Sequence, residues 1–252
     1  MNLEGKLALV TGGGRGIGAA IARRLAGDGA RVIVTGRDEA AIAAIATELG
    51  GVALRADLTD RAATDRLVAQ VRAVGRVDVL VNNAGIAESA SLERTDDAMW
   101  DRILELDATA PFRLIRALVP AMVEAGWGRV VNLASNAGVS GYGYTAAYCA
   151  AKHAMVGMTR ALAIDLARTG VTINAVCPGW VETDMARAAV ARIQAKTGRN
   201  EDDARAALVS MSPQRRMVQP DEVAHLVAML CDDRARSIHG QAMLIDGGQV
   251  LK

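Results

Sequence analysis

Several kinds of segment are absent from this 252-residue sequence. No apolar run approaches the roughly 18 residues that cross a bilayer, and the chain starts Met1-Asn-Leu-Glu-Gly-Lys6, which is unlike a secretion signal. The 29 Lys and Arg residues nearly balance the 28 Asp and Glu residues, with no block of either sign. These features predict a cytoplasmic protein that binds neither membranes nor nucleic acids.

Cysteine and histidine are also scarce. The three cysteines, Cys149, Cys177 and Cys231, are an odd number, and they stand far apart in apolar surroundings. This arrangement is typical of reduced thiols in a cytosolic protein rather than of disulfides. Neither the cysteines nor the three histidines have the spacing of metal ligands, so the sequence predicts no metal site.

Short runs of Val, Ile and Leu alternate with longer Ala-rich helical patterns along the whole chain. Continuous apolar strands separated by helices predict an α/β fold, with a parallel sheet covered on both faces. No linker or repeat divides the chain, so we expect one domain over residues 1–252, with a mostly helical lid at about 183–211. The expected strands are Leu7–Val10, Val32–Thr35, Val52–Arg55, Val79–Val81, Val130–Leu133, Thr172–Val176 and Ala242–Ile245.

A glycine-rich turn, Thr11-Gly-Gly-Gly-Arg-Gly-Ile-Gly18, lies between the first expected strand and a helix predicted at Ile17–Ala26. Glycines at this place let a pyrophosphate approach the backbone, and the helix N-terminus supplies N–H donors. A flexible loop without a ligand is the alternative. The strand–turn–helix context favours a dinucleotide site. Its expected contacts in the turn are Gly12, Arg15, Gly16, Ile17 and Gly18.

The second strand ends in Val34-Thr-Gly-Arg-Asp38. A free ribose 2′-hydroxyl requires a carboxylate at the strand tip, whereas a 2′-phosphate requires a cation. Gly36 occupies the expected acidic position, and Arg37 together with Arg15 could grip a phosphate. This pattern favours NADP(H). NAD(H) remains possible, because Asp38 would read the ribose if the strand ended one residue later, and both arginines could simply be solvated.

Polar residues follow the next two strands. Asp57 could meet an adenine amino group or, with Thr59 and Asp60, cap the following helix. The fourth strand ends in Asn82-Asn-Ala-Gly85, where small and amide residues suit a ligand that crosses the switch point of the sheet, although a plain turn has a similar composition. Further cofactor contacts are therefore expected at Asp57, Leu58, Asn83, Ala84 and Gly85.

All three tyrosines of the chain lie within the segment Ser135–Lys152. Tyr148 and Lys152 are four residues apart in a helical pattern, so both project from one face. A phenol has a pKa near ~10, and a fixed ammonium nearby lowers that pKa. Ser135 follows an apolar strand and could hold a substrate oxygen beside Tyr148. These residues predict a proton-transfer site for carbonyl/alcohol interconversion, although Tyr-x-x-x-Lys alone also occurs in ordinary core helices.

With these motifs in order, the sequence resembles the classical short-chain dehydrogenase/reductase family over essentially its whole length. The resemblance implies a Rossmann-type, doubly wound, seven-stranded parallel sheet. It also implies a homotetramer, with one interface at Asp97–Ala125 and Ala147–Ala167 and another at the C-terminal strand. The motifs that carry the resemblance are Thr11-Gly-x-x-x-Gly-x-Gly18, Asn82-Asn-Ala-Gly85, Ser135, Tyr148-x-x-x-Lys152, Pro178-Gly179 and Thr183.

The resemblance also implies a role for each matching residue. Tyr148 would be the general acid/base, Ser135 would orient the carbonyl, and Lys152 would lower the pKa of the tyrosine. Tyr148 and Lys152 would also contact the cofactor, the lysine through the nicotinamide ribose. The glycine spacing and the four-residue Tyr-to-Lys gap disfavour the epimerase and enoyl reductase subclasses. The nicotinamide amide would be held by Pro178, Gly179, Val181 and Thr183.

One residue departs from the family pattern. The family places an Asn in the helix before the fifth strand, and Leu106-Asp107-Ala108 aligns with that position. An Asp could still hold the helix bend and a relay water through its carboxylate or its backbone carbonyl. Its negative charge near Lys152 should weaken the effect of the lysine on Tyr148. We therefore predict an intact catalytic site that includes Asp107 and has an altered pH optimum.

Four large side chains flank the expected pocket mouth. They could line an apolar or aromatic substrate site, or they could simply pack beneath the lid. The four arginines of the lid recur at varied spacing, which is typical of solvated helix faces rather than of an anion site. The flanking side chains are Tyr142, Tyr144, Trp180 and Met185, and the arginines are Arg187, Arg192, Arg199 and Arg205.

The predicted function is that of an NADP(H)-dependent oxidoreductase that interconverts a 3-oxoacyl-type or cyclic or aryl ketone and a secondary alcohol, with Tyr148 relaying the proton. The segment Glu124-Ala-Gly-Trp127 lacks the basic cluster of carrier-protein-dependent reductases, which argues against a dedicated role in fatty-acid synthesis. An NAD(H)-dependent alcohol or 3-hydroxyacid dehydrogenase is the alternative. A dinucleotide sensor without turnover is a third, and the intact Ser135 and Lys152 argue against it.

Overall fold

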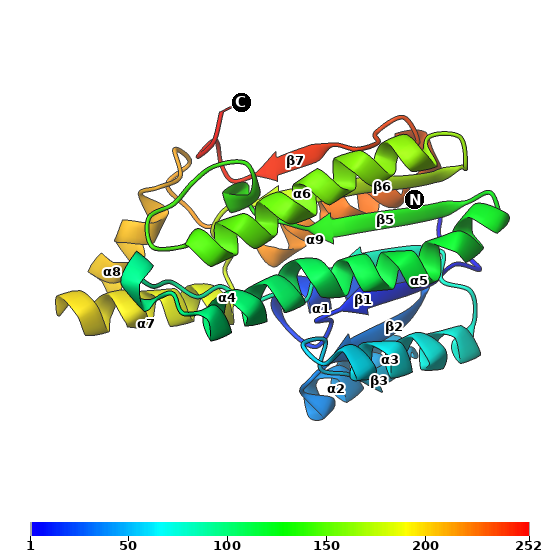
Figure 1. The fold of residues 1–252 in the computed structure, drawn as a ribbon, viewed down its shortest axis with the longest axis horizontal. Coiled ribbons are helices and arrows are strands. Elements are labelled where there is room, and N and C mark those ends of the chain that lie inside the picture. Colours follow the sequence, from blue (N-terminus) through cyan, green and yellow to red (C-terminus); the bar gives the residue numbers. More distant parts are fainter. Residues whose placement is uncertain (1, 252) are drawn as a thin grey trace.

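The computed structural model describes residues 2–251, so only the two end positions of the expected range 1–252 lie outside it. Within this range seven strands form a single sheet in the order β3-β2-β1-β4-β5-β6-β7, and every neighbouring pair is parallel (Figure 1). The predicted fold class and strands are confirmed. The strands are β1 (Leu7–Thr11), β2 (Arg31–Gly36), β3 (Val52–Arg55), β4 (Val79–Asn82), β5 (Gly128–Leu133), β6 (Val171–Pro178) and β7 (Ala242–Ile245).

Helices cover both faces of the sheet, as continuous apolar strands require. The α5 and α6 helices cross the near face in Figure 1, with α3 beside them, while α1 and α9 lie behind the sheet. The helices are α1 (Gly16–Gly27), α2 (Glu39–Leu49), α3 (Arg61–Val74), α4 (Asp97–Leu104), α5 (Ala110–Glu124), α6 (Ala146–Leu166), α7 (Asp184–Thr197), α8 (Glu201–Val209) and α9 (Pro220–Cys231). A π-helical turn, η2 (Glu105–Thr109), joins α4 to α5, and short 3-10 turns form η1 (Leu92–Arg94), η3 (Asn136–Gly138) and η4 (Asp233–Ala235).

The strand order places a crevice at the carboxyl ends of β1 and β4. The chain builds β1 to β3 toward one edge of the sheet and β4 to β7 toward the other, so the direction of winding reverses between these two central strands. All residues of both strands are buried. In open parallel sheets the crevice at such a reversal receives the ligand.

The expected helical insertion consists of α7 and α8, which lie beyond the carboxyl ends of the strands (Figure 1). The two helices share a small apolar cluster of their own, formed by Ala186, Val190, Leu208 and neighbouring side chains. A parallel bridge between Val181 and Val218 joins the segment before α7 to the segment after α8, so the two ends of the insertion lie side by side. In residues 2–251 no helix is both long and apolar enough to span a membrane.

Candidate active site

The glycine turn after β1 packs directly on the end of β4. A Cβ added to Gly18 would lie 2.2 Å from the Gly12 carbonyl oxygen, and one added to Gly12, whose φ is +62°, would lie 2.9 Å from Asn83 Nδ2. Thr11 Oγ1 accepts hydrogen bonds from the Asn83 and Ala84 amides, both at 2.9 Å. The turn therefore forms a narrow cradle without room for side chains, which suits the backbone approach of a pyrophosphate at the N-terminus of α1.

A cavity of about 620 Å³ opens above this cradle and brings together most of the expected cofactor contacts. Arg15 and Arg37 line it and are exposed, and neither makes a salt bridge within residues 2–251. Asp38 lines the same cavity, but its carboxylate caps α2 by accepting from the Ala41 amide at 3.1 Å. The expected residues that line this cavity are Gly12, Arg15, Gly16, Ile17, Gly18, Arg37, Asp57, Leu58, Asn83, Ala84 and Gly85.

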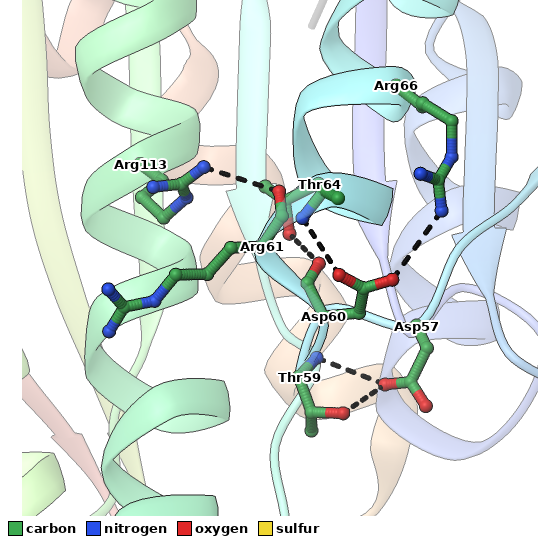
Figure 2. A network of polar contacts seen from close by, with 8 residues as sticks. Asp57, Thr59, Asp60, Arg61, Thr64, Arg66 and Arg113 are labelled. Carbon is green, nitrogen blue, oxygen red and sulfur yellow. Dashed lines mark hydrogen bonds and ion pairs between the residues drawn. The ribbon is translucent and has the colours of Figure 1, made fainter.

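The two interpretations of the Asp57 segment are separated by the structure (Figure 2). Asp60 is the N-cap of α3 and accepts from the Ala62 amide at 2.8 Å. Asp57 lines the cavity, and its Oδ1 accepts from the Thr59 amide and hydroxyl at 3.0 and 2.7 Å. Burial alone would raise the pKa of Asp57, but the bonds from Thr59 and the charge of Arg37 lower it. The result is an ionised acceptor beside the cavity, with the capping assigned to Asp60.

A second cavity, of about 480 Å³, has the expected catalytic residues among its lining. Ser135 follows β5 and accepts a hydrogen bond from the Ala137 amide at 3.1 Å. Tyr148 and Lys152 reach the same cavity from the first two turns of α6, and the Lys152 Nζ lies 5.7 Å from the centroid of the Tyr148 ring. Lys152 is 3% exposed and donates to the Leu133 carbonyl at 2.9 Å. The one-face geometry predicted from the spacing is therefore present.

Asp107 lies in the π-helical turn η2 and is fully buried. Its Oδ1 accepts from the Ile86 amide at 2.9 Å, and its Oδ2 lies 3.1 Å from Lys152 Nζ. This contact is an ion pair between two buried side chains. The carboxylate of Asp107 thus contacts Ile86 and Lys152, and the relay water expected at this residue stays a prediction.

The ion pair controls the electrostatics at the base of the cavity. Burial disfavours the ammonium of Lys152, but the charge and hydrogen bonding of Asp107, together with the charge of Tyr148, outweigh it, and the pKa of Lys152 is raised. Burial also raises the pKa of Tyr148. Lys152 opposes this rise, Asp107 adds to it, and a hydrogen bond with Ser135 lowers it. The net effect is a phenol that holds its proton more tightly than it would beside an unpaired lysine.

Three of the four expected pocket side chains, Tyr142, Trp180 and Met185, line the 480 Å³ cavity. The expectation for Tyr144 is wrong, because this side chain is 72% exposed and does not line the cavity. Its backbone has a φ of +64°, in the left-handed region, and the loop turns the ring outward. The residues expected at the nicotinamide, Pro178, Gly179, Val181 and Thr183, line the same cavity.

Several lining residues were not predicted from the sequence. Gln249 reaches the cavity from beyond β7 and donates to the Tyr142 hydroxyl at 3.1 Å, across 107 positions of the chain. No local pattern indicates that contact. Residues of α7 also line the cavity at helical spacing, and that spacing was available as a signal. Beside the predicted Met185, they are Ala186, Ala189, Arg192, Ile193, Lys196 and Thr197.

The chain is similar to several known proteins over its full length. A family model described as enoyl-(acyl carrier protein) reductase matches residues 12–249. The 3-oxoacyl-(acyl-carrier-protein) reductase of Escherichia coli is 40% identical over 254 residues, covering 100% of both chains. The D-beta-hydroxybutyrate dehydrogenase of Cupriavidus necator is 38% identical and covers 99% of this chain and 100% of its own.

A solved structure agrees with these relatives. A variant of actinorhodin polyketide ketoreductase, determined with NADPH, superposes with a TM-score of 0.92 at 39% identity, over 97% of each chain. Its similarity extends from the sheet to the α7–α8 region, because so little of either chain is left uncovered. The protein therefore belongs to the short-chain dehydrogenase/reductase family.

Proposed function

We propose that this protein transfers a hydride between NADP(H) and a ketone/secondary-alcohol pair, with Tyr148 as the general acid/base. The observation that carries the proposal is the junction of the two cavities. Ser135, Tyr148 and Lys152 line the smaller one, which shares Asn83, Thr183 and other residues with the cavity above the glycine cradle. A dinucleotide held in the cradle would therefore present its reactive end where the phenol lies.

The side chains divide the reaction between them. When bound, NADPH supplies the hydride that the carbonyl carbon receives. The Tyr148 hydroxyl donates its proton to the carbonyl oxygen, and Ser135 Oγ orients that oxygen through a hydrogen bond. The charge of Lys152 stabilises the phenolate that remains, and Asp107 fixes the position of that charge. In the reverse direction the phenolate removes the proton of the alcohol.

The cofactor preference rests on the charged groups around the larger cavity. Arg15 and Arg37 are unpaired within the described residues and can take a 2′-phosphate, whereas the carboxylate of Asp38 is occupied at the helix cap. The ketoreductase with NADPH supports the same preference. NAD(H) is the second candidate, because Asp38 still lines the cavity and a D-beta-hydroxybutyrate dehydrogenase is 38% identical.

The remaining features of the proposal concern organisation and substrate. Residues 1–252 form one cytoplasmic domain in which α7 and α8 act as a lid over the substrate cavity, and the chain assembles as a homotetramer. Solution scattering tests the assembly, and a monomer would contradict it. The substrate is a 3-oxoacyl-type, cyclic or aryl ketone, as the 3-oxoacyl reductase and ketoreductase relatives suggest.

The test follows nicotinamide absorbance with NADPH and with NADH over a panel of acetoacetyl thioesters, cyclic diketones and aryl ketones. Turnover with NADPH that is lost in Tyr148→Phe would support the reductase. A preference for NADH would indicate that Asp38, rather than Arg37, contacts the ribose of the cofactor. Tight binding of either cofactor without turnover of any ketone would contradict the proposal and favour a dinucleotide sensor.

A further inference from the structure

Two cations of α7 line the substrate cavity without an acidic partner. Arg192 and Lys196 are one helical turn apart, both are exposed, and both belong to the lining of the 480 Å³ cavity. Within residues 2–251 neither makes a salt bridge or a side-chain hydrogen bond. An exposed cation can remain unpaired at little cost, so both guanidinium and ammonium are available to a ligand in the cavity.

The other lid arginines differ from these two. Arg187 pairs with Asp184, and Arg205 pairs with Glu182. Arg199 lines neither cavity. The interpretation of all four arginines as solvated helix faces therefore does not extend to Arg192, which lines both cavities and shares one side of α7 with Lys196.

Apart from Arg192 and Lys196, the charged side chains that line the cavity are neutralised by ion pairs. Its acidic lining residues are Asp107, which lies 3.1 Å from Lys152, and Glu88, which lies 2.9 Å from Arg102. The lid also contributes apolar side chains to this cavity, among them Met185, Ile193, Leu208 and Met211. Arg192 and Lys196 thus leave an excess of positive charge over an otherwise neutral, largely apolar cavity.

We propose that Arg192 and Lys196 form an anion subsite, and that the preferred substrate is a ketone with a carboxylate or phosphate at the end remote from its carbonyl. This inference rests on the proposed function. The apolar lid side chains would contact the connecting carbon chain, and a cavity of about 480 Å³ has the size of sites for small ligands of this kind. Arginine can bind either anion with two parallel hydrogen bonds, and lysine contributes a point charge.

The experiment compares matched substrate pairs at low and high salt. One pair is a medium-chain keto acid and its methyl ester, and the other is a keto alcohol and its phosphate ester. At low salt we expect kcat/KM of the anion to exceed that of its neutral partner by about tenfold, and the ratio to fall as salt screens the exposed charges. The pair with the larger ratio identifies the carboxylate or the phosphate as the natural group.

Lys196→Gln should lower kcat/KM about three- to fivefold for the anions, because an exposed pair contributes modestly, and should leave the neutral ketones unchanged. Arg192→Gln should also reduce the preference for the anions, and the double variant should abolish it. Arg199→Gln is the matched control, since it removes a lid cation that lines neither cavity. An effect only on KM for NADPH in Arg192→Gln, with no change in Lys196→Gln, would overturn the subsite.

Failure of this inference is distinguishable from failure of the proposed function. Turnover of the neutral ketones with no preference for the anions contradicts the anion subsite and leaves the reductase intact. If no ketone is turned over, the proposed function fails, and calorimetric binding of the keto acid and its ester in the presence of NADPH still decides the subsite. Equal affinities, or a preference that Lys196→Gln does not alter, would overturn it.

Discussion

Lys152 and Lys196 line the same cavity in opposite settings. Lys152 is 3% exposed, and both the Asp107 carboxylate at 3.1 Å and the Leu133 carbonyl at 2.9 Å hold its ammonium. Lys196 is exposed and has no partner within residues 2–251. A buried charge must be compensated within the fold, whereas an exposed one need not be. The first cation is therefore part of the fixed electrostatics of the reaction, and the second is left for a ligand.

The largest expected effect comes from removing the group that the buried cation serves. Tyr148→Phe leaves the pair of Lys152 and Asp107 in place and deletes only the hydroxyl, so we expect kcat to fall by about a thousandfold. NADPH affinity, measured by fluorescence titration, should change little. A variant that retained most of its ketone reduction would assign proton transfer to another group. Tyr142→Phe is the matched control, because this phenol lines the same cavity and lacks a lysine partner.

The variant Lys152→Met tests the role of the buried cation. This change leaves Asp107 buried without its cation, and we expect a loss of about 3–5 kcal/mol in the free energy of unfolding at neutral pH. Burial raises the pKa of Asp107 and Lys152 opposes that rise, so the pKa should rise further in the variant. A carboxyl with a raised folded-state pKa favours folding when protonated, and this contribution is lost as the pH rises through that pKa.

Urea unfolding over a pH series checks this expectation. The variant should approach the stability of the parent protein in acid and fall away toward neutral pH. The double change Asp107→Asn with Lys152→Met should recover part of the loss, because it removes the uncompensated charge. Lys196→Met serves as the exposed control and should be nearly neutral. A loss independent of pH, and not relieved by Asp107→Asn, would indicate that packing rather than charge governs this position.

The buried site around Lys152 and the exposed site at Lys196 also differ in how much of each can be predicted from the sequence. Tyr148 and Lys152 were predicted because a helix places residues four apart on one face, and the glycine turn because it sits between a strand and a helix. Each of these signals is local. The sequence also placed Asp107 near Lys152, but only through the family resemblance, and which of its oxygens makes the contact depends on the π-helical turn.

Other contacts could not be predicted because tertiary packing brings them together. Gln249 reaches the cavity from beyond β7, far from the catalytic motif in sequence. Asp57 and Asp60 are both suitable caps, three residues apart, and only the path of the backbone assigns the cap to Asp60. The prediction for Tyr144 was wrong, because this side chain is 72% exposed and does not line the cavity, in a loop where its φ is +64°.

A third cation, Arg37, extends the comparison to an exposed group in the cofactor cavity. Arg37, like Lys196, is exposed, lines a cavity and makes no salt bridge among the described residues. Arg37→Gln should raise the Kd for NADPH about tenfold through loss of a charge-assisted bond to the 2′-phosphate, and should leave the Kd for NADH unchanged. Arg31→Gln, at the opposite end of β2, is the control. Equal losses for both cofactors would argue against a phosphate contact.

The smallest expected effect is a shift of the pH–rate profile when Asp107, the partner of Lys152, is changed. Alcohol oxidation requires the Tyr148 phenolate, so its rate should rise with pH through the pKa of the phenol. Asp107 raises that pKa, while Lys152 lowers it. Removing the carboxylate in Asp107→Asn leaves the attraction of Lys152 unopposed, and we expect the rising limb to move to lower pH. Ketone reduction requires the protonated phenol, so its falling limb should move in the same direction.

The direction of this shift depends on which charges face Tyr148. The groups that act on it are Lys152, Asp107, Ser135 and Cys149, and only Asp107 is altered in the variant. Glu105→Gln removes a carboxylate from the same π-helical turn, one that pairs with Arg61 instead, and should leave both limbs in place. Unchanged profiles in Asp107→Asn would mean that the effect of Lys152 on the pKa of Tyr148 does not depend on its ion pair with Asp107. A shift to higher pH would mean that the carboxylate is needed to hold the lysine toward Tyr148.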